Sequence, residues 1–274
     1  MRTPEEILQQ AINEYDPVKI LLMVSGGHDS IVNAFKSAEC LTKWRIPFEV
    51  YHGDTTIGIA ETQRYVKFIA QLYGWKLNIR RPPKKEDWYE SIVAKYGFPG
   101  RTKSAHRYMY IKLKERALRH FVTHECKSSP MARENVLLLT GIRADESAIR
   151  MGYQKVITKD ASRIWVSPIY HWTESDCKRY MENNHIPKNP VKEKICISGE
   201  CLCGSWAAKE EEAEIRNAFP AMGAQLDVLK AIAEKNGFPW RWGQGPNMWK
   251  VEQYRKRQLT LNFMCVGCDR REII

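Results

Sequence analysis

The feature that most constrains the fold is the run Val-Lys-Ile-Leu-Leu-Met-Val at residues 18–24, which is followed at once by Ser25, Gly26 and Gly27. A mainly apolar run that ends in a glycine pair is typical of a strand buried on both faces of a parallel sheet. The glycines predict a tight turn where that strand ends. We therefore expect residues 18–24 to form the central strand of an α/β sheet.

Other short apolar runs follow, with helical patterns between most of them, at residues 48–52, 77–79, 136–140 and 164–167. Ahead of the first strand, Thr3 is a suitable helix cap and Pro4 fits a first helical turn. Alternating strands and helices of this kind predict a doubly wound, mostly parallel Rossmann-like α/β sheet.

The pattern changes after Pro190 to a cysteine-rich stretch, an acidic helix expected at about residues 209–216, and a final cysteine pair. We interpret this part as a small, Cys-rich, helical subdomain. The predicted domains are residues 1–195 and residues 196–274. A chain of this length has room for one large core and a smaller one.

Composition limits the compartment and the partners. No apolar signal sequence begins the chain and no run approaches the roughly 18 apolar residues of a membrane span, so we expect a cytoplasmic protein without membrane association. The eight cysteines are then thiols or metal ligands rather than disulfides. Residues 76–120 hold 13 Lys or Arg against 4 Asp or Glu, which predicts a surface that attracts polyanions or, equally, a solvated basic helix.

Polar clusters follow the ends of three predicted strands, at residues 25–30, 53–56 and 141–143. In open α/β sheets, ligands bind beyond the carboxyl ends of the strands. We therefore expect these three clusters to converge on one site.

The loop Ser25-Gly26-Gly27-His28-Asp29-Ser30 precedes a helix that we expect to begin near residue 31. Its glycines let the backbone approach a phosphate, and exposed amides together with the helix dipole favour an anion. The hydroxyls of Ser25 and Ser30 can donate to phosphate oxygens, while Asp29 can orient the loop or help to hold Mg²⁺. Neither a Walker A motif nor a Gly-x-Gly-x-x-Gly fingerprint is present, which disfavours kinase-like ATPases and nicotinamide dehydrogenases.

This loop resembles that of the PP-loop superfamily, which comprises N-type ATP pyrophosphatases, such as GMP synthetase and tRNA thiolation enzymes, and phosphoadenosine phosphosulfate (PAPS) reductases. Over residues 18–205 the chain is most similar to the PAPS reductase family, in the family's order. The motifs that carry the similarity are His52-Gly53-Asp54-Thr55-Thr56 with Glu61-Thr62, then Thr140-Gly141-Ile142-Arg143-Ala144-Asp145-Glu146-Ser147 with Arg150, then Ser167-Pro168-Ile169-Tyr170-His171-Trp172-Thr173-Glu174-Ser175-Asp176.

The resemblance implies an enzyme with an adenine-nucleotide site. Groups near Asp54 and Thr55 would contact the adenosine. The phosphates or sulfate would meet the loop together with Gly141, Arg143, Glu146, Ser147 and Arg150. Of these, Asp29, Arg143 and Arg150 are the predicted catalytic residues, because an arginine fork suits an oxyanion.

Two features of that assignment have simpler interpretations. Arg143, Asp145, Glu146 and Arg150 can also cap and salt-bridge a surface helix. His28 stands where many PAPS reductases have Lys, which replaces a fixed charge by a titratable one, and it can equally be a variable solvent-facing position.

Cys201, Cys203, Cys265 and Cys268 are the predicted metal ligands, with Cys196 as the alternate. Clustered pairs that the fold brings together complete the four-thiolate shell of zinc or of an iron–sulfur cluster. The region resembles the iron–sulfur branch of the family, which favours a [4Fe–4S] cluster over Zn²⁺. The remaining cysteines stand alone in helical patterns and are expected to be small buried hydrophobic residues; these are Cys40, Cys126 and Cys177.

Sulfonucleotide reductases similar to this chain carry a nucleophilic cysteine in a C-terminal Glu-Cys-Gly-hydrophobe-His segment, whereas this sequence ends at residues 268–274 without one. We therefore expect ATP pyrophosphatase chemistry with ATP and Mg²⁺. The enzyme would adenylate an oxygen of an acceptor molecule, and sulfur would then replace that oxygen with help from the cluster. Reduction of PAPS or adenylyl sulfate through a thiolate is the second hypothesis. A nucleotide sensor with structural zinc and no turnover is the third.

Nucleic acid is the expected acceptor, because basic and aromatic side chains together suit a single strand. The residues that suggest it are Arg101, Lys103, His106, Arg107, Lys112, Lys114, Arg116 and Arg119, with Tyr108, Tyr110, Trp240, Arg241 and Trp242. The aromatic residues can instead belong to a core or a lid, and the basic ones can bind the nucleotide's own phosphates. A cysteine desulfurase or a redox partner is implied by the resemblance alone.

Overall fold

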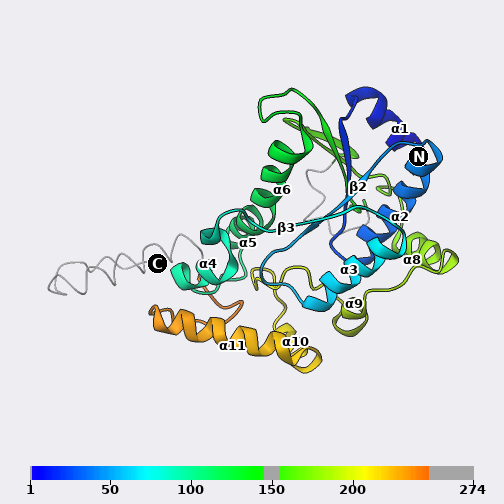
Figure 1. Cartoon of the computed structure of the whole chain (residues 1–274). Coiled ribbons are helices and arrows are strands. Elements are labelled where there is room, and N and C mark those ends of the chain that lie inside the picture. Colours follow the sequence, from blue (N-terminus) through cyan, green and yellow to red (C-terminus); the bar gives the residue numbers. More distant parts are fainter. Residues whose placement is uncertain (1, 145–154, 247–274) are drawn as a thin grey trace. The chain divides into compact units, whose positions relative to one another are not determined.

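A computed structural model describes residues 2–144 and 155–246 (Figure 1). Backbone contacts divide these residues into two compact units. Unit 1 comprises residues up to 88 together with residues 111–202, and unit 2 comprises residues 89–110 together with the described residues from 203 onward. Residues 89–110 thus belong with the C-terminal part, which no sequence pattern had indicated. The functional division at residue 195 stays a prediction.

The sheet of unit 1 has six strands in the order β3-β2-β1-β4-β6-β5. All neighbouring pairs are parallel except β5 and β6. Their bounds are β1 Lys19–Met23, β2 Glu49–Gly53, β3 Leu77–Arg80, β4 Val136–Leu139, β5 Ile157–Asp160 and β6 Arg163–Val166. The predicted α/β sheet with a central first strand is confirmed.

Strand β5 was not predicted. Its sequence Ile-Thr-Lys-Asp is mostly exposed, because β5 is an edge strand that pairs only with β6. A strand in that position carries no apolar run for a sequence pattern to detect.

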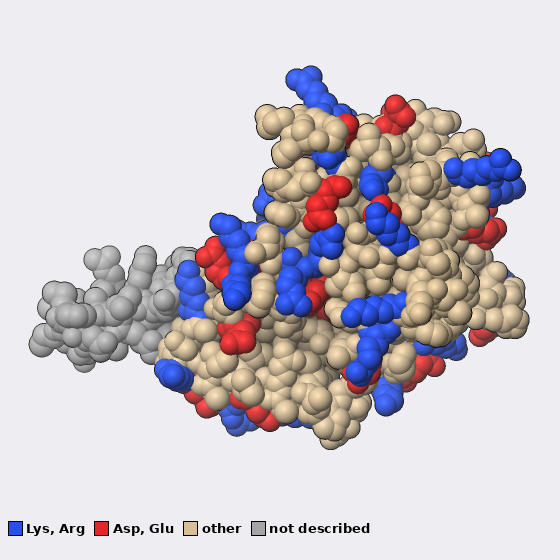
Figure 2. Space-filling view, viewed as in Figure 1, with Lys and Arg blue, Asp and Glu red and all other residues tan. Residues whose placement is uncertain are grey.

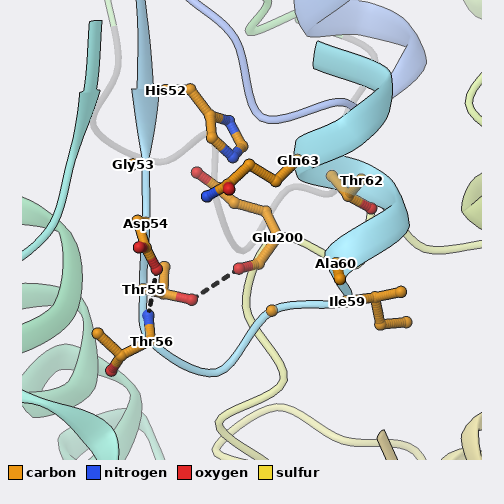
Figure 3. A pocket seen from close by; sticks show the side chains of 11 residues that line it. His52, Gly53, Asp54, Thr55, Thr56, Ile59, Ala60, Thr62, Gln63 and Glu200 are labelled. Carbon is orange, nitrogen blue, oxygen red and sulfur yellow. Dashed lines mark hydrogen bonds between the residues drawn. The ribbon is translucent and has the colours of Figure 1, made fainter. Parts of the chain in front are cut away.

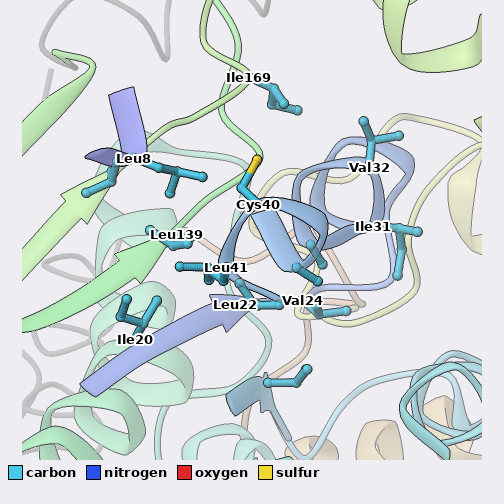
Figure 4. Close-up of a cluster of buried hydrophobic side chains, with 14 of the residues drawn as sticks. Leu8, Ile20, Leu22, Val24, Ile31, Val32, Cys40, Leu41, Leu139 and Ile169 are labelled. Atoms are coloured by element: carbon cyan, nitrogen blue, oxygen red, sulfur yellow. The ribbon is translucent and has the colours of Figure 1, made fainter. Parts of the chain in front are cut away.

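Alternation along the strands gives the sheet two buried faces. On one face, Ile20, Leu22 and Leu139 pack against helices α1 (Pro4–Tyr15), α2 (His28–Lys43), α3 (Ala60–Leu72) and α8 (Glu174–Asn183) (Figure 4). On the other face, Leu21 and Leu138 pack against α6 (Arg116–Phe121) and the π-helical turn η3 (Val122–Cys126). Helices therefore cover both faces, as the doubly wound prediction requires.

Two helix starts show how local sequence acts. Helix α1 begins with the capping box predicted from Thr3, whose hydroxyl accepts from the Glu6 amide while the Glu6 carboxylate accepts from the Thr3 amide. The prediction for α2 was wrong by three residues, since that helix begins at His28 with Gly27 as its cap. Asp29 and Ser30 consequently lie in the first helical turn rather than in a loop.

A continuous helical segment between β3 and β4 contains two π-helical turns, η2 (Ile111–Glu115) and η3. Asp87, which lies in the short helix η1 (Lys85–Asp87), is buried beneath this segment and accepts from Lys112 and Arg116 at 2.7 Å. Burial alone would raise the Asp87 pKa, but these two donors outweigh it and lower the pKa. The buried charge is thereby satisfied.

Unit 2 consists of helices α4 (Tyr89–Tyr96), α5 (Lys103–Tyr110), α10 (Glu211–Ala218) and α11 (Pro220–Lys235). Tyr89, Phe98 and Leu226 are buried in it. The predicted acidic helix is present as α10, two residues later than expected. No helix in the described part of the chain is long and apolar enough to cross a membrane.

The three isolated cysteines lie in unit 1 and are buried as predicted. Burial raises the thiol pKa to about 11 for Cys40 and Cys126 and to about 12 for Cys177. These thiols stay protonated at neutral pH and have no nucleophilic role.

Candidate nucleotide site

The site lies where the order of the strands reverses. Strands β1 and β4 are neighbours, yet the chain proceeds from β1 outward to β2 and β3 before it returns to β4. The loop of residues 25–30, called here the phosphate loop, and residues 141–143 follow these two strands. This is the topological switch point at which open α/β sheets bind ligands.

The two connections pack tightly against each other. A Cβ atom on Gly141 would lie 2.3 Å from the Asp29 carbonyl oxygen and 2.6 Å from the Ser30 amide nitrogen. From the third strand end, His52 Nδ1 lies 2.8 Å from the Val24 carbonyl oxygen. The predicted convergence of three strand ends is therefore present in unit 1.

The phosphate loop is held by its own residues. Gly26 has φ +83°, a left-handed conformation that favours glycine. The Ser30 hydroxyl donates to the Gly27 carbonyl at 2.8 Å and accepts from the Ser25 amide at 3.2 Å, and the Gly27 amide donates to the Ser25 hydroxyl at 3.3 Å. The loop is thus held in shape by its own hydrogen bonds, at the amino end of a 16-residue helix.

Arg143 forms an ion pair with Asp29. Its Nη2 donates to one carboxylate oxygen at 3.1 Å, and its Nε lies 3.1 Å from the other. Arg143 is buried, with 6% of its surface exposed. The guanidinium is therefore held beside the phosphate loop.

His28 is half-buried, with Nε2 3.6 Å from a carboxylate oxygen of Glu193. Burial lowers its pKa, and the nearby Lys192 acts in the same direction. At neutral pH this side chain is uncharged, so it does not replace the positive charge of the family's lysine.

A cavity of about 240 Å³ opens beside the phosphate loop, at the end of β2 (Figure 3). The Asp54 carboxylate accepts from the Thr56 amide at 2.9 Å and pairs with Arg81 at 2.7 Å. The residues that line the cavity are His52, Gly53, Asp54, Thr55, Thr56, Gly58, Ile59, Ala60, Thr62, Gln63 and Glu200.

One wall of this cavity comes from residues 198–202, called here the pocket wall. The Ile59 amide donates to the Gly199 carbonyl at 2.8 Å, and the Leu202 amide donates to the Ile57 carbonyl at 2.7 Å. The Thr55 hydroxyl donates to the Glu200 carbonyl at 2.6 Å. These bonds bring Glu200 into the cavity, a position that no sequence motif had predicted.

Asn189 joins the pocket wall to the phosphate loop. It caps helix α9 (Pro190–Ile195) by accepting from the Val191 amide at 3.0 Å. Its amide nitrogen donates to the Gly26 carbonyl at 2.9 Å and the Ser198 carbonyl at 3.2 Å. Asn189 is fully buried. No sequence motif had predicted this role. The sequence Asn-Pro is a signal for a helix start and indicates only the cap.

The structure therefore brings most of the predicted nucleotide residues together in two adjacent places, the phosphate loop with Gly141 and Arg143, and the β2 cavity with Asp54 and Thr55. Glu146, Ser147 and Arg150, together with Asp145, lie outside the described residues. Their predicted roles stay predictions.

Of the predicted cysteine ligands, Cys201 is half-buried and lies in the pocket wall, whereas Cys196 is exposed and ends α9 in a left-handed conformation. In unit 2, Cys203 is buried, and its Sγ lies 3.1 Å from the Ser205 hydroxyl. Cys265 and Cys268 lie outside the described residues. Within residues 2–144 and 155–246, no three His, Cys, Asp or Glu side chains form a metal-binding group.

Cys201 and Cys203 lie two positions apart in the chain, a spacing that suits two places of a four-thiolate shell. The described residues offer no further ligand for that shell. A [4Fe–4S] cluster would therefore need the final cysteine pair as well.

The predicted nucleic-acid surface is smaller than expected. Lys112, Lys114 and Arg116 form ion pairs within unit 1, to Asp87 and Glu200. Trp242 is buried in unit 2 and belongs to its core. On the face shown in Figure 2, basic side chains are interspersed with acidic ones. Exposed basic residues remain on and beside α5, namely Arg101, Lys103 and Arg107.

The sheet order, the glycine-rich loop at the switch point and the cavity at the end of β2 define a doubly wound α/β protein with a candidate ligand site at the carboxyl ends of its strands. The chain matches the family model of the phosphoadenosine phosphosulfate reductase domain over residues 19–268 and belongs to that family. No curated protein matches the sequence.

The chain is similar to several solved structures. A phosphoadenylyl-sulfate reductase from Candida auris, in complex with phosphate, is 20% identical, with a TM-score of 0.50 over 70% of this chain and 84% of the other. An FMN adenylyltransferase from Candida glabrata, with FAD and pyrophosphate, is 14% identical, with a TM-score of 0.48 over 70% and 59%. The U34-tRNA thiolase NcsA from Methanococcus maripaludis, with its [4Fe–4S] cluster, is 11% identical, with a TM-score of 0.48 over 98% and 84%.

Proposed function

We propose that this protein is an ATP pyrophosphatase that adenylates an acceptor and so prepares it for sulfur transfer. The observation that carries the proposal is the phosphate loop with Arg143 held beside it. Backbone amides at a helix start and a guanidinium are donors that a polyphosphate needs. The cavity at the end of β2 then accepts the nucleoside.

In the proposed reaction an acceptor oxygen attacks the α-phosphorus of ATP. The bond from that phosphorus to the bridging oxygen of the β-phosphate breaks, and pyrophosphate leaves with the bond's electrons. The phosphate loop binds the leaving pyrophosphate, which gains negative charge as the bond breaks. Asp29 is the carboxylate beside the loop that can help to hold Mg²⁺.

A sulfur nucleophile then attacks the activated atom of the acceptor and releases AMP. Cys201, Cys203, Cys265 and Cys268 would hold a [4Fe–4S] cluster with one thiolate on each iron, so an iron would bind sulfur only in exchange for one of these thiolates. A cysteine desulfurase is the class of partner that would deliver that sulfur, and a redox partner is the alternative. Nucleic acid is the proposed acceptor, with Arg101, Lys103 and Arg107 as the exposed cations that would contact it.

Reduction of PAPS or adenylyl sulfate is the second candidate, and family membership favours it. That reaction needs a thiolate to attack the sulfate sulfur. The raised pKa values of Cys40, Cys126 and Cys177 disqualify these three thiols. Cys196 is the exposed thiol in the described part of the chain, so a reductase would depend on it or on a cysteine elsewhere.

The test is to purify the protein without oxygen, measure its iron, and incubate it with ATP, PAPS or adenylyl sulfate. We expect about four irons per chain and release of pyrophosphate from ATP without sulfite. Arg143→Gln should lower the rate by about tenfold or more, as the loss of a charged hydrogen-bond donor predicts. Lys178→Gln, which removes an exposed pair with Glu174, is the matched control.

Thiol-dependent release of sulfite from a sulfonucleotide would replace this proposal with the reductase. A protein that binds ATP and holds zinc but releases neither product would be the sensor. If Lys178→Gln slowed the reaction as much as Arg143→Gln, the assignment of Arg143 would be wrong.

A further inference from the structure

The lining of the cavity at the end of β2 holds two carboxylates, each paired with a basic residue outside the lining, namely Arg81 for Asp54 and Lys114 for Glu200. The described lining itself contains no Lys or Arg. Phosphate sites in proteins use arginine, lysine or backbone amides at a helix start. A carboxylate instead accepts hydrogen bonds from hydroxyl and amino groups.

Glu200 is the more buried of the two carboxylates, with 10% of its side chain exposed. In Figure 3 it rises from the pocket wall between β2 and α3, toward the side of the cavity where His52 and Gln63 lie. One carboxylate oxygen, Oε2, pairs with Lys114 at 2.5 Å. Lys114 comes from the π-helical turn η2. The Lys114 ammonium group therefore forms an ion pair with Glu200.

The other oxygen, Oε1, lies beside the end of β2, 3.5 Å from where a Cβ atom on Gly53 would stand. None of the hydrogen bonds found among the described residues uses it. Glu200 therefore has an oriented acceptor left for a ligand, while its carbonyl oxygen is fixed by the Thr55 hydroxyl at 2.6 Å. Glu200 is therefore fixed at its main-chain carbonyl by Thr55 and at one carboxylate oxygen by Lys114.

Neighbouring parallel strands set this acceptor and the phosphate loop at the same edge of the sheet. The phosphate loop follows β1, and β2 is hydrogen-bonded to β1 in parallel. A nucleotide with its phosphates at the phosphate loop extends its sugar and base toward the end of β2. Free ribose hydroxyls can donate to Glu200, whereas a phosphate on the 3′ oxygen would bring like charges together in a partly buried cavity.

We propose that Glu200 is the specificity-determining residue through which this site accepts an adenine nucleotide with free ribose hydroxyls and rejects one with a 3′-phosphate. The inference rests on the proposed function, since it requires an adenine nucleotide with its phosphates at the phosphate loop. It names the substrate class, which is ATP-like rather than PAPS-like.

The experiment compares AMP with adenosine 3′,5′-bisphosphate, two ligands that differ only by the 3′-phosphate, by calorimetric titration of the full chain. We expect the wild type to bind AMP more tightly. Glu200→Gln should reduce that preference by about tenfold or more, because one like charge is removed at nearly constant volume. Glu61→Gln is the matched control, since Glu61 is a neighbouring carboxylate on α3 that is 39% exposed and pairs with Arg64.

Retained AMP binding in Glu200→Gln shows that the variant is folded, so the ratio of the two affinities reports specificity. An unchanged ratio in Glu200→Gln, an equal shift in Glu61→Gln, or a wild-type preference for the bisphosphate would each overturn the inference. The first two outcomes leave the proposed function intact. If the wild type binds neither nucleotide, the proposed function fails and the inference fails with it.

Discussion

Acidic side chains lie at both ends of the strands β1, β2 and β3, but the two ends of the sheet use them differently. At the amino end, Glu49 of β2 accepts from Lys19 of β1 at 2.7 Å, from Asn78 of β3 at 2.8 Å and from Lys76 at 3.0 Å. Its side chain is 12% exposed. Both oxygens of this carboxylate therefore accept from side chains of the protein itself.

At the carboxyl end, three carboxylates each have one basic partner, in the pairs Asp29 with Arg143, Asp54 with Arg81 and Glu200 with Lys114. A cavity and a glycine-rich turn lie beside them. The same chemical groups therefore stabilise the sheet at one end and leave acceptors, donors and space at the other. Unused hydrogen-bonding capacity next to a cavity distinguishes the candidate site from a structural ion cluster.

The largest effect expected from this comparison is on nucleotide binding in Gly141→Ala. The added methyl group would meet the backbone of Asp29 and Ser30 at 2.3–2.6 Å, so the phosphate loop must move. We expect the displaced loop to lower the affinity for ATP on the order of a hundredfold. Calorimetric titration measures this affinity. Gly74→Ala is the control, because Gly74 has φ +65° with nothing within 4 Å of the added atom. If Gly141→Ala bound ATP normally, the assignment of the phosphate loop to the nucleotide site would be wrong.

An intermediate effect is expected when Glu49 is changed at the amino ends of the strands, and it should concern only the stability of the protein. Burial would raise the Glu49 pKa, but the bonds from Lys19, Lys76 and Asn78 outweigh it and lower the pKa to about 2. Glu49→Gln should lower the free energy of unfolding at neutral pH by about 1–3 kcal/mol, since charged hydrogen bonds are lost. Urea unfolding measures this change, and ATP affinity should stay the same.

The same residue predicts the acid limb of stability. A depressed carboxyl pKa stabilises the protein above its unfolded value, and that contribution is lost as pH falls from about 4.5 toward 2. The variant Glu49→Gln should therefore lose less stability than the wild type over that range. Glu86→Gln, at a side chain that is 71% exposed, should behave like the wild type. If all three proteins lost the same stability over that range, Glu49 and its three donors would not be the source of the acid limb.

The smallest effect concerns His28 at the carboxyl end. Burial lowers its pKa, so the unfolded chain binds the proton more readily than the folded one. Stability should consequently fall as pH drops through the ordinary histidine value of about 6.5. His28→Asn should reduce this slope in thermal unfolding between about pH 7.5 and pH 5.5. An unchanged slope in His28→Asn would place the titration elsewhere.

The sequence by itself determined the α/β class, the central strand, the phosphate loop and the order of the three strand ends. These follow from contacts between residues close in the chain, such as the cap at Thr3, the left-handed Gly26 and the Ser25–Ser30 hydroxyl bonds, and from the apolar pattern of buried strands. Local chemistry of this kind is visible in a short window of residues.

Only the tertiary structure decided which distant residues complete the site. Glu200 is 145 residues from Thr55 and Asn189 is 163 residues from Gly26, yet both pairs are hydrogen-bonded. Tertiary structure also showed that Lys112, Lys114 and Arg116 neutralise buried carboxylates, although they read as part of a basic surface. No local pattern encodes such contacts, because a buried charge is satisfied by whichever partner the fold brings to it.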